Sequence, residues 1–160
     1  MPLIPADQRL LERAVELSEI ALNLGNRPFG AVLGDAQGHI LAEAQNDECT
    51  SADPTGHAEM NIVKRIAGLT QKQLEGATIY ASGEPCAMCA CAIFWSGVRR
   101  VVFAASGSFF SGLEKPNAML MSLSCQEVLS HGSHEVEVIG PVSGTKAEDI
   151  LRHAAESKRI

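Results

Sequence analysis

The sequence of 160 residues has no excess of positive charge: 13 Lys and Arg stand against 19 Asp and Glu, for a formal net charge of −6. This balance disfavours a large phosphate-binding surface and a nucleic-acid partner, although a local basic patch can coexist with an acidic whole. No uncharged apolar run approaches the roughly 18–20 residues that would span a bilayer, so we expect no membrane segment. The N-terminus also lacks the basic and apolar stretches of a signal peptide.

A disulfide pattern is missing as well. The five cysteines are odd in number and unevenly spaced, which does not suggest a disulfide framework and fits a reducing, cytoplasmic setting. No internal repeat, low-complexity segment or linker-like stretch divides the chain. The composition is 46% hydrophobic, and the length is enough to bury a full core. We therefore expect one domain over residues 1–160.

Hydrophobic periodicity and turn residues predict ten elements in the order α-β-β-α-β-α-β-α-β-α. The predicted helices cover residues 7–24, 57–69, 85–97, 116–130 and 145 onward, and the predicted strands cover residues 29–35, 39–46, 76–82, 99–105 and 135–140. Alternation of strands and helices from the third strand onward favours right-handed crossovers and helices on both faces of a sheet. The expected fold class is α/β, a three-layer α/β/α sandwich with a mixed five-stranded sheet.

Several residues carry signals for helix ends. Asp7 is a plausible N-cap of the first helix and Gly25 a plausible stop. Pro116 suits the first turn of a helix that runs to about residue 130. Thr145 and Glu148 have the spacing of a capping box for the last helix.

Three potential metal ligands begin two predicted helices. His57 and Glu59 form H-x-E at one helix start, and Pro85, Cys86 and Cys89 form P-C-x-x-C at the next, a combination typical of the zinc deaminases. Both sulfurs of a C-x-x-C at a helix start can reach one ion, and the helix N-terminus favours thiolate over thiol. Two thiolates and one imidazole suit tetrahedral Zn²⁺, so we predict one Zn²⁺ per subunit on His57, Cys86 and Cys89.

Three protein ligands leave a fourth coordination position open, which is typical of a catalytic zinc. The ion would lower the pKa of a bound water toward neutrality, and the resulting hydroxide would attack a ring carbon that bears an exocyclic amino group. Glu59, at the mouth of the helix, would take the proton from that water and deliver it to the leaving amine. The predicted enzyme is therefore a zinc-dependent aminohydrolase that releases ammonia.

The cysteine pattern by itself is compatible with further roles. Cys86 and Cys89 could form a redox pair, or half of a closed zinc site completed by Cys91, Cys49, Cys125 or another histidine. A zinc domain without catalysis would be a binding module. Cys91 lies about 200° around the helix from Cys89, so we expect it to point away from the metal and, like Cys49 and Cys125, to be a small buried side chain.

The same residues resemble the cytidine deaminase-like superfamily, over nearly the whole chain. Residues 27–33, 44–46, 53–59 and 84–95 are similar to the branch that contains guanine deaminases and tRNA adenosine deaminases. The resemblance implies that His57, Cys86 and Cys89 bind zinc and that Glu59 is the catalytic proton shuttle.

The resemblance also implies a set of substrate contacts. The family's substrate-binding asparagine falls on Asn46, and the backbone N–H groups of Ala58 and Cys86 would hold the base and the hydroxide. Phe29 matches an aromatic residue that lines the base pocket, although it could equally belong to the core. Trp95 would stack near the substrate or pack at a dimer contact, since this family generally forms homodimers.

The choice of substrate depends on segments that differ from the tRNA enzymes. The last helix balances Arg152, Lys158 and Arg159 against three acidic residues, and residues 106–120 lack the arginine-aspartate pair usual in those enzymes. We therefore expect a free nucleobase or a similar aminated heterocycle, with guanine first, purine nucleobase metabolism as the setting and a tRNA adenosine deaminase as the alternative. Glu114 is the candidate carboxylate for the purine edge, or a solvated charge. Phe109 and Phe110 would form an apolar lid or pack on the protein body.

Overall fold

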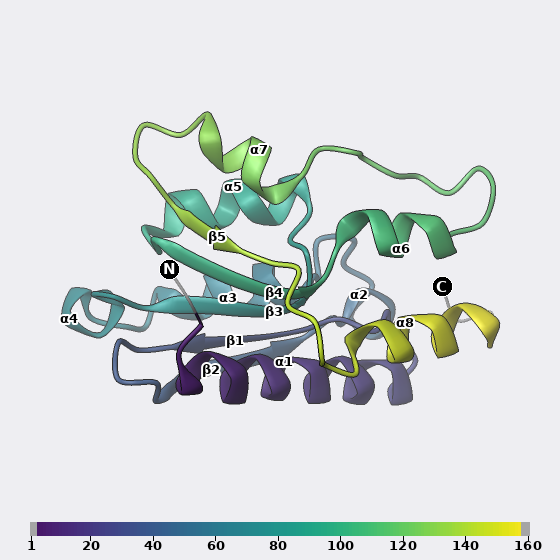
Figure 1. The fold of residues 1–160 in the computed structure, drawn as a ribbon, viewed down its shortest axis with the longest axis horizontal. Helices are drawn as coiled ribbons and strands as arrows, with labels where there is room; N and C mark the ends of the chain where they lie inside the picture. Colours follow the sequence, from purple (N-terminus) through teal and green to yellow (C-terminus); the bar gives the residue numbers. More distant parts are fainter. Residues whose placement is uncertain (1–2, 158–160) are drawn as a thin grey trace.

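The computed structural model describes residues 3–157 and shows a sheet between two layers of helices (Figure 1). The strands are β1 (Gly30–Gly34), β2 (Ile40–Gln45), β3 (Thr78–Gly83), β4 (Arg100–Ala105) and β5 (Glu137–Ile139). The helices are α1 (Pro5–Asn23), α2 (Glu48–Ser51), α3 (Ala58–Ile66), α4 (Gln71–Leu74), α5 (Ala87–Ser96), α6 (Gly107–Leu113), α7 (Cys125–Ser130) and α8 (Ala147–Glu156). No helix within residues 3–157 is both long and apolar enough to cross a membrane.

The sheet has five strands in the order β2-β1-β3-β4-β5. β1 pairs antiparallel with β2 and with β3, whereas β3, β4 and β5 pair in parallel. Parallel neighbours need a crossover connection, and the chain supplies α5 between β3 and β4, followed by α6 and α7 between β4 and β5. The mixed five-stranded sheet predicted from the sequence is confirmed.

Alternate residues of the central strands face two separate cores. Leu33, Ile79 and Val101 pack in the core that α3, α5 and α7 cover. Val32 and Val102 pack in the other core, beneath α1 and α8. Both faces of the central strands are therefore apolar and covered, which confirms the three-layer α/β/α class.

The first helix begins earlier than its sequence signal indicates. Its N-cap is Ile4, and Asp7 lies in the first turn, where its carboxylate accepts a hydrogen bond from the Ile4 N–H at 2.9 Å. The prediction of Asp7 as N-cap is wrong because Pro5 can already occupy the first helical position. Gly25, with φ +86°, follows the helix end as predicted.

The predicted helix over residues 116–130 is also wrong. Two shorter helices, α6 and α7, lie here, and residues 114–124 between them are not helical. Two serines set the starts: Ser106 Oγ accepts from the Phe109 N–H and Ser124 Oγ from the Glu127 N–H, each at 3.1 Å. Serine caps of this kind stabilise a helix start, and Pro116 lies outside both helices.

The capping box of the last helix is not formed. Lys146 occupies the N-cap of α8, so Glu148 lies at the second helical position instead of the third. Thr145 Oγ1 instead accepts a hydrogen bond from the Ala147 N–H at 3.3 Å. The residues Lys158 and Arg159, which the sequence assigns to this helix, lie outside the described residues.

Candidate metal centre and active site

The three predicted metal ligands lie at the starts of two helices that pack against each other. His57 is the N-cap of α3, Cys86 is the N-cap of α5, and Cys89 lies in the first turn of α5. The N–H groups at a helix start and the positive end of the helix dipole stabilise negative charge. Two helix N-termini therefore converge on the position where two thiolates would be needed.

The distances between the ligand atoms fit a zinc ion. The Nδ1 atom of His57 lies 3.6 Å from Sγ of Cys86 and 3.5 Å from Sγ of Cys89, and the three ligand atoms lie within 4.8 Å of one another. With Zn–S near 2.3 Å and Zn–N near 2.05 Å, a tetrahedral site requires an N···S separation of about 3.6 Å. The ligand set predicted from the sequence is thus positioned to hold Zn²⁺ through His57 Nδ1 and both sulfurs.

The two thiols are unequal in acidity. Hydrogen bonding from the Cys89 thiol, together with His57, lowers the pKa of Cys86 to about 4. The same contact with Cys86, reinforced by burial, raises the pKa of Cys89. Cys86 is therefore a thiolate at neutral pH even before a metal binds, which is the form that ligates zinc.

The remaining cysteines stay outside this site. Among the described residues, the ligand atoms of His57, Cys86 and Cys89 form the group close enough together to hold an ion. Cys91 and Cys49 are both exposed, so the prediction that they are buried is wrong, whereas Cys125 is buried as predicted. The closed four-ligand site that the sequence left open is not formed by these cysteines.

Glu59 lies on α3 at the second residue after His57. Its side chain is buried, and burial raises the pKa of its carboxyl to about 7. The carboxyl lies close enough to Cys89 to raise the pKa of that thiol, so the acid is beside the ligand set without belonging to it. A carboxyl with a pKa near neutrality, next to a metal site, is suited to accept and release a proton.

The predicted substrate contacts Phe29, Asn46 and Ala58 lie just before β1, just after β2 and at the start of α3. Asn46 follows β2 and is buried, and its backbone N–H donates to the Phe29 carbonyl at 2.9 Å. Ala58, also buried, is the first residue of α3 and separates His57 from Glu59. Asn46 is therefore joined to Phe29, and Ala58 lies within the helix start that carries His57 and Glu59.

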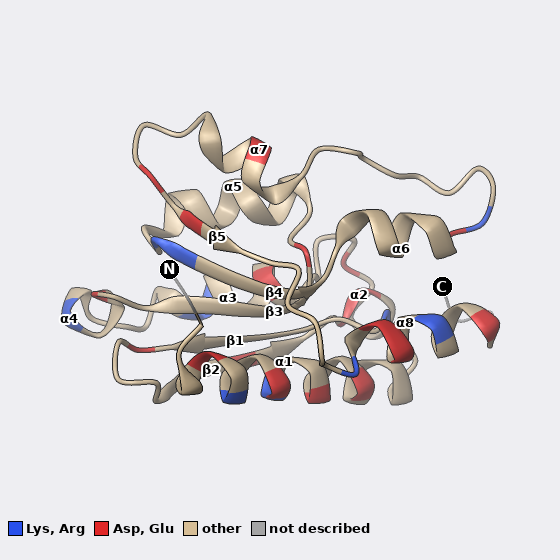
Figure 2. Cartoon of the chain, in the orientation of Figure 1, with Lys and Arg blue, Asp and Glu red and all other residues tan. Residues whose placement is uncertain are grey.

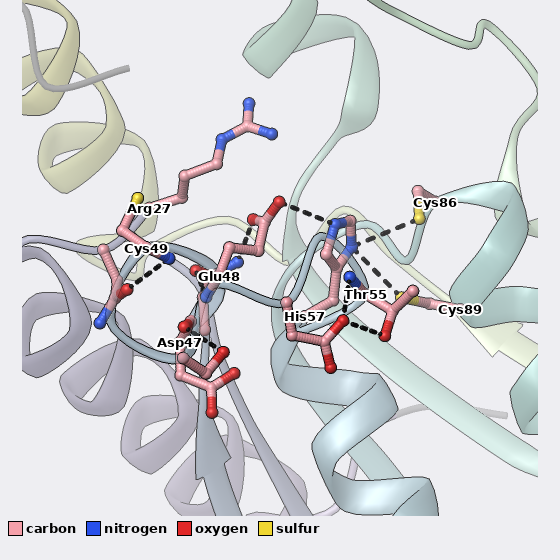
Figure 3. Close-up of polar contacts among 12 residues, drawn as sticks. Arg27, Asp47, Glu48, Cys49, Thr55, His57, Cys86 and Cys89 are labelled. Carbon is pink, nitrogen blue, oxygen red and sulfur yellow. Dashed lines mark hydrogen bonds and ion pairs between the residues drawn. The ribbon is translucent and has the colours of Figure 1, made fainter.

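Glu48 is a site residue that sequence reasoning did not identify. Figure 3 shows the imidazole of His57 between the Glu48 carboxylate on one side and the sulfurs of Cys86 and Cys89 on the other. Oε1 of Glu48 lies 3.6 Å from Nε2 of His57, and Oε2 accepts a hydrogen bond from Nδ2 of Asn46 at 2.5 Å. A carboxylate in a polar loop gives no periodic signal, so only the folded loop reveals this position.

Glu84, two residues before Cys86, ties the site to its surroundings. Its carboxylate accepts hydrogen bonds from the backbone N–H of Gly107 at 2.8 Å and of Cys125 at 2.9 Å. These residues begin α6 and α7, and the Glu84 N–H donates to the Ala105 carbonyl at the end of β4. The Glu84 carboxylate therefore aligns two helix starts, and its backbone N–H holds a strand end, next to the metal ligands.

An aromatic and cationic cluster borders the site on the side of Phe29. The rings of Phe29 and Phe110 meet edge to face at 5.1 Å, and the Arg27 guanidinium lies 4.9 Å from the Phe110 centroid. Arg27 also donates a hydrogen bond to the Glu114 carboxylate. The structure thus brings Glu114 into an ion pair with Arg27, a residue that the sequence did not single out.

Phe109 and Trp95 lie apart from these groups. The guanidinium of Arg152 on α8 lies 5.2 Å from the centroid of the Phe109 ring. Phe109 also packs against the core beneath α1 and α8. Trp95 is in the last turn of α5, at the opposite end of the helix from Cys86, and its side chain is 83% exposed. The structure does not bring Trp95 to the metal ligands, and its role in the pocket stays a prediction.

A three-layer α/β/α domain with a His-Cys-Cys metal site beside a buried glutamate defines the class of zinc-dependent deaminases, hydrolases that act on C–N bonds. The family model of the "cytidine and deoxycytidylate deaminase zinc-binding region" matches residues 5–105. This match covers more than half of the chain, and the chain belongs to that family.

Three relatives with different substrates are similar to this chain. A probable cytosine deaminase of Schizosaccharomyces pombe is 36% identical over 137 residues, which are 84% of this chain and 83% of the relative. A tRNA-specific adenosine deaminase of Haemophilus influenzae is 41% identical over 62% of this chain and 58% of the relative. A guanine deaminase of Bacillus subtilis is 42% identical over 61% of this chain and 64% of the relative. The chain thus matches less than two thirds of the length of the last two relatives.

A solved structure has the same fold. The guanine deaminase from Nitrosomonas europaea superposes with a TM-score of 0.75 over 98% of this chain and 87% of its own, at 20% sequence identity. At this identity the likeness establishes the fold alone. The family and the fold are therefore established, and the relatives leave the substrate undecided among nucleobases and tRNA.

Proposed function

We propose that this chain is a zinc-dependent deaminase of a free nucleobase, with guanine as the leading substrate, which it would convert with water into xanthine and ammonia. The observation that carries the chemistry is the buried Glu59 carboxyl beside the ligand set of His57, Cys86 and Cys89. A purely structural zinc site has no use for an acid with a pKa near 7 next to it. The guanine deaminase relative, at 42% identity, supports the choice of base.

The roles of the chain's own residues follow from their positions. His57, Cys86 and Cys89 would hold the zinc ion, which as a Lewis acid would make a bound water more acidic. Glu59 takes a proton from the attacking water at its carboxylate and passes it to the amino group that leaves as ammonia. The C–O bond forms at the ring carbon that carried the amino group, and the C–N bond breaks.

Substrate orientation is proposed for the residues around Asn46. An amide side chain can both donate and accept, as a purine edge requires, and Asn46 lies at the strand end beside the site. The backbone N–H of Ala58 lies at the start of α3, and the Phe29 ring offers a flat apolar surface. Glu114 stays a candidate contact for the purine edge, in competition with its partner Arg27.

Free bases are favoured over tRNA by the distribution of charge. In α8, basic and acidic residues are mixed, and Arg152 lies 3.4 Å from Asp149 (Figure 2). The arginine nearest the aromatic cluster, Arg27, is already paired with Glu114. An anticodon loop requires cations that are available to phosphates. The alternative, a tRNA adenosine deaminase, draws support from the Haemophilus influenzae relative at 41% identity.

Ammonia release from the zinc-loaded protein tests the proposal. Guanine, adenine, cytosine, their nucleosides and a tRNA anticodon stem-loop would be compared at equal concentration, and guanine is expected to be consumed fastest. Inosine formation in the stem-loop without turnover of free bases would favour the tRNA alternative. If cytosine is the best substrate, the assignment of guanine is wrong. If none of these compounds releases ammonia, the proposal that the chain is a deaminase is wrong.

A second experiment tests the proton shuttle. The Glu59→Gln variant should bind zinc in the wild-type ratio and lose at least about 10²-fold in kcat, the effect expected of a removed general acid and base. Activity that survives this change would exclude Glu59 from the mechanism.

We further propose that residues 1–160 form one cytoplasmic domain that acts as a homodimer with one zinc site per subunit. The two cores share a single sheet, which supports one domain. The exposed Trp95, which meets Phe94 edge to face at 5.4 Å, supports a contact between subunits at the end of α5.

A further inference from the structure

Glu48 contacts the metal site and the proposed substrate site at the same time. It is the first residue of α2, in the segment that leads from β2 to α3. One carboxylate oxygen, Oε2, accepts the 2.5 Å hydrogen bond from Asn46 Nδ2, and the other, Oε1, faces Nε2 of His57 at 3.6 Å (Figure 3). Each oxygen of the carboxylate therefore has a different partner.

On the His57 side, the carboxylate faces the ring nitrogen that does not point at the sulfurs. Nδ1 lies 3.5–3.6 Å from the two cysteine sulfurs, so Nε2 is on the outer edge of the ring. A carboxylate opposite Nε2 favours the tautomer with its proton there, which leaves the Nδ1 lone pair for a metal. The contact is longer than a hydrogen bond by about 0.5 Å, so it acts here as an electrostatic guide for the ring.

On the Asn46 side, the amide is held at both ends. Its Nδ2 donates to the Glu48 carboxylate, and its Oδ1 accepts from the Glu48 backbone N–H at 3.2 Å. A flipped amide would place a donor against the N–H and an acceptor against the carboxylate. The buried Asn46 side chain is therefore fixed in one orientation by a single neighbour.

We propose that Glu48 is a positioning residue that orients the metal ligand His57 and the amide of Asn46 with one carboxylate. A carboxylate accepts on both oxygens, whereas a glutamine has one acceptor and one donor and can serve only one of these two partners. The role of Glu48 toward Asn46 rests on the proposed function. Its role toward His57 rests only on the metal site, so that part of the proposal can be tested without any substrate.

The first test compares zinc affinities by competition with a chelator. Glu48→Gln should lower the affinity of the full chain by about 10- to 100-fold, the loss expected when the outer partner of a ligating histidine is removed. Glu12→Gln, the same chemical change on an exposed residue of α1 that contacts Gln8, is the matched control and should leave the affinity unchanged. A loss of less than about threefold in Glu48→Gln would overturn the proposal.

A double variant separates positioning from general damage. In Asn46→Asp with Glu48→Gln, the amide of Gln donates to the new carboxylate, so its oxygen is again free to face His57. The double variant should recover at least half of the lost zinc affinity on a logarithmic scale. A smaller recovery would mean that the change at Glu48 acts through the fold alone, and would overturn the proposal.

A spectroscopic measurement decides the matter if the double variant does not fold. In the zinc-loaded wild type, the Nε2 proton of His57 should give an NMR signal whose chemical shift reflects the facing Glu48 carboxylate. In Glu48→Gln and Glu48→Ala this signal should shift, while Glu12→Gln leaves it unchanged. An unaltered signal in both Glu48 variants would overturn the proposal. Because neither readout involves turnover, an inactive protein with these signatures would contradict only the proposed function.

Discussion

The carboxylate of Asp7 on α1 accepts two hydrogen bonds from the guanidinium of Arg100 on β4, at 2.7 and 2.9 Å. The Asp7 side chain is fully buried, and the hydroxyl of Tyr80 on β3 donates to it at 2.7 Å. These bonds join the first helix to two central strands of the sheet. They also explain how a charged residue is accommodated beneath α1: its lone pairs are satisfied by two side-chain donors, one of them charged.

Replacement of Asp7 by Asn should destabilise the protein by about 3 kcal/mol, because the change leaves the Arg100 guanidinium without its main buried counter-charge. The measurement is the free energy of unfolding in urea at pH 7. Asp149→Asn, the same change in an exposed pair with Arg152, should cost less than about 1 kcal/mol. A similar cost for both variants would show that the Asp7 pair contributes no more than a surface contact.

The Asp7 site should also give stability a pH dependence in acid. Burial acts to raise the pKa of this carboxyl, but the hydrogen bonds from Arg100, the Ile4 N–H and Tyr80 outweigh it and hold the pKa below its ordinary value of 3.8. A lowered folded-state pKa means that the stabilisation is present above the unfolded-state pKa of about 3.9 and is lost as the pH falls through the folded value.

The difference in unfolding free energy between wild type and Asp7→Asn should therefore be constant from about pH 7 to 5 and shrink below about pH 4. Both proteins would be measured with a chelator present, so that zinc release does not contribute. A difference that stays constant down to about pH 2.5 would contradict the assignment of this titration to Asp7.

Two cysteines in one helix should respond differently to the same substitution. Cys89→Ser should abolish stoichiometric zinc binding and lower the unfolding temperature by several degrees, because a ligand that stabilises only the folded state is lost. Cys91→Ser, which alters an exposed thiol two residues further on, should retain zinc and stability. Chelation of zinc from the wild type should reproduce the effect of Cys89→Ser on the unfolding temperature. Zinc loss in Cys91→Ser would contradict the ligand set.

A methyl group at Gly56, next to His57, should disturb the site. A Cβ atom there would collide with Oδ1 of Asp47 and lie 3.0 Å from the Asp53 carbonyl, so Gly56→Ala should cost about 1–3 kcal/mol and weaken zinc binding. Gly112→Ala is the control: no atom lies within 4 Å of its Cβ, and the glycine is helical, so the change should be neutral or stabilise by up to about 1 kcal/mol. Calorimetry and zinc titration measure both. Wild-type zinc affinity in Gly56→Ala would show that the loop tolerates the added methyl group.

The proposed homodimer can be tested at Trp95. Its 83% exposed side chain would be covered in a dimer that uses the end of α5, so Trp95→Lys should shift the protein toward monomer by placing a charge in the contact. Light scattering after size-exclusion chromatography gives the mass. Glu12→Gln, a change on α1 on the opposite face of the sheet from α5, is the control and should leave the mass unchanged. A wild-type monomer at micromolar concentration would contradict the dimer.

The mixed sheet, the sequence of strands along the chain and the metal ligands could all be predicted from the residues. These features depend on local patterns: a continuous apolar run in strands such as β4, and ligand spacing at two helix starts, where His57, Cys86 and Cys89 begin α3 and α5. Capping residues predicted the helix ends less accurately. Ser106 and Ser124 proved stronger start signals than Pro116, because a side-chain oxygen that accepts a backbone N–H supplies a bond that proline does not.

Which polar groups face one another could not be predicted and depends on the packing of the folded chain. Asp7 and Arg100 are 93 positions apart, and Glu48 meets His57 only because the loop after β2 folds back against the start of α3. Likewise, exposure separates Cys91 from Cys89 although both lie in α5. Hydrophobic periodicity predicts which side of a helix or strand is buried, but it does not predict which residue pairs with a buried charge. That partner is fixed by the packing of distant segments, where an unpaired charge would cost several kcal/mol.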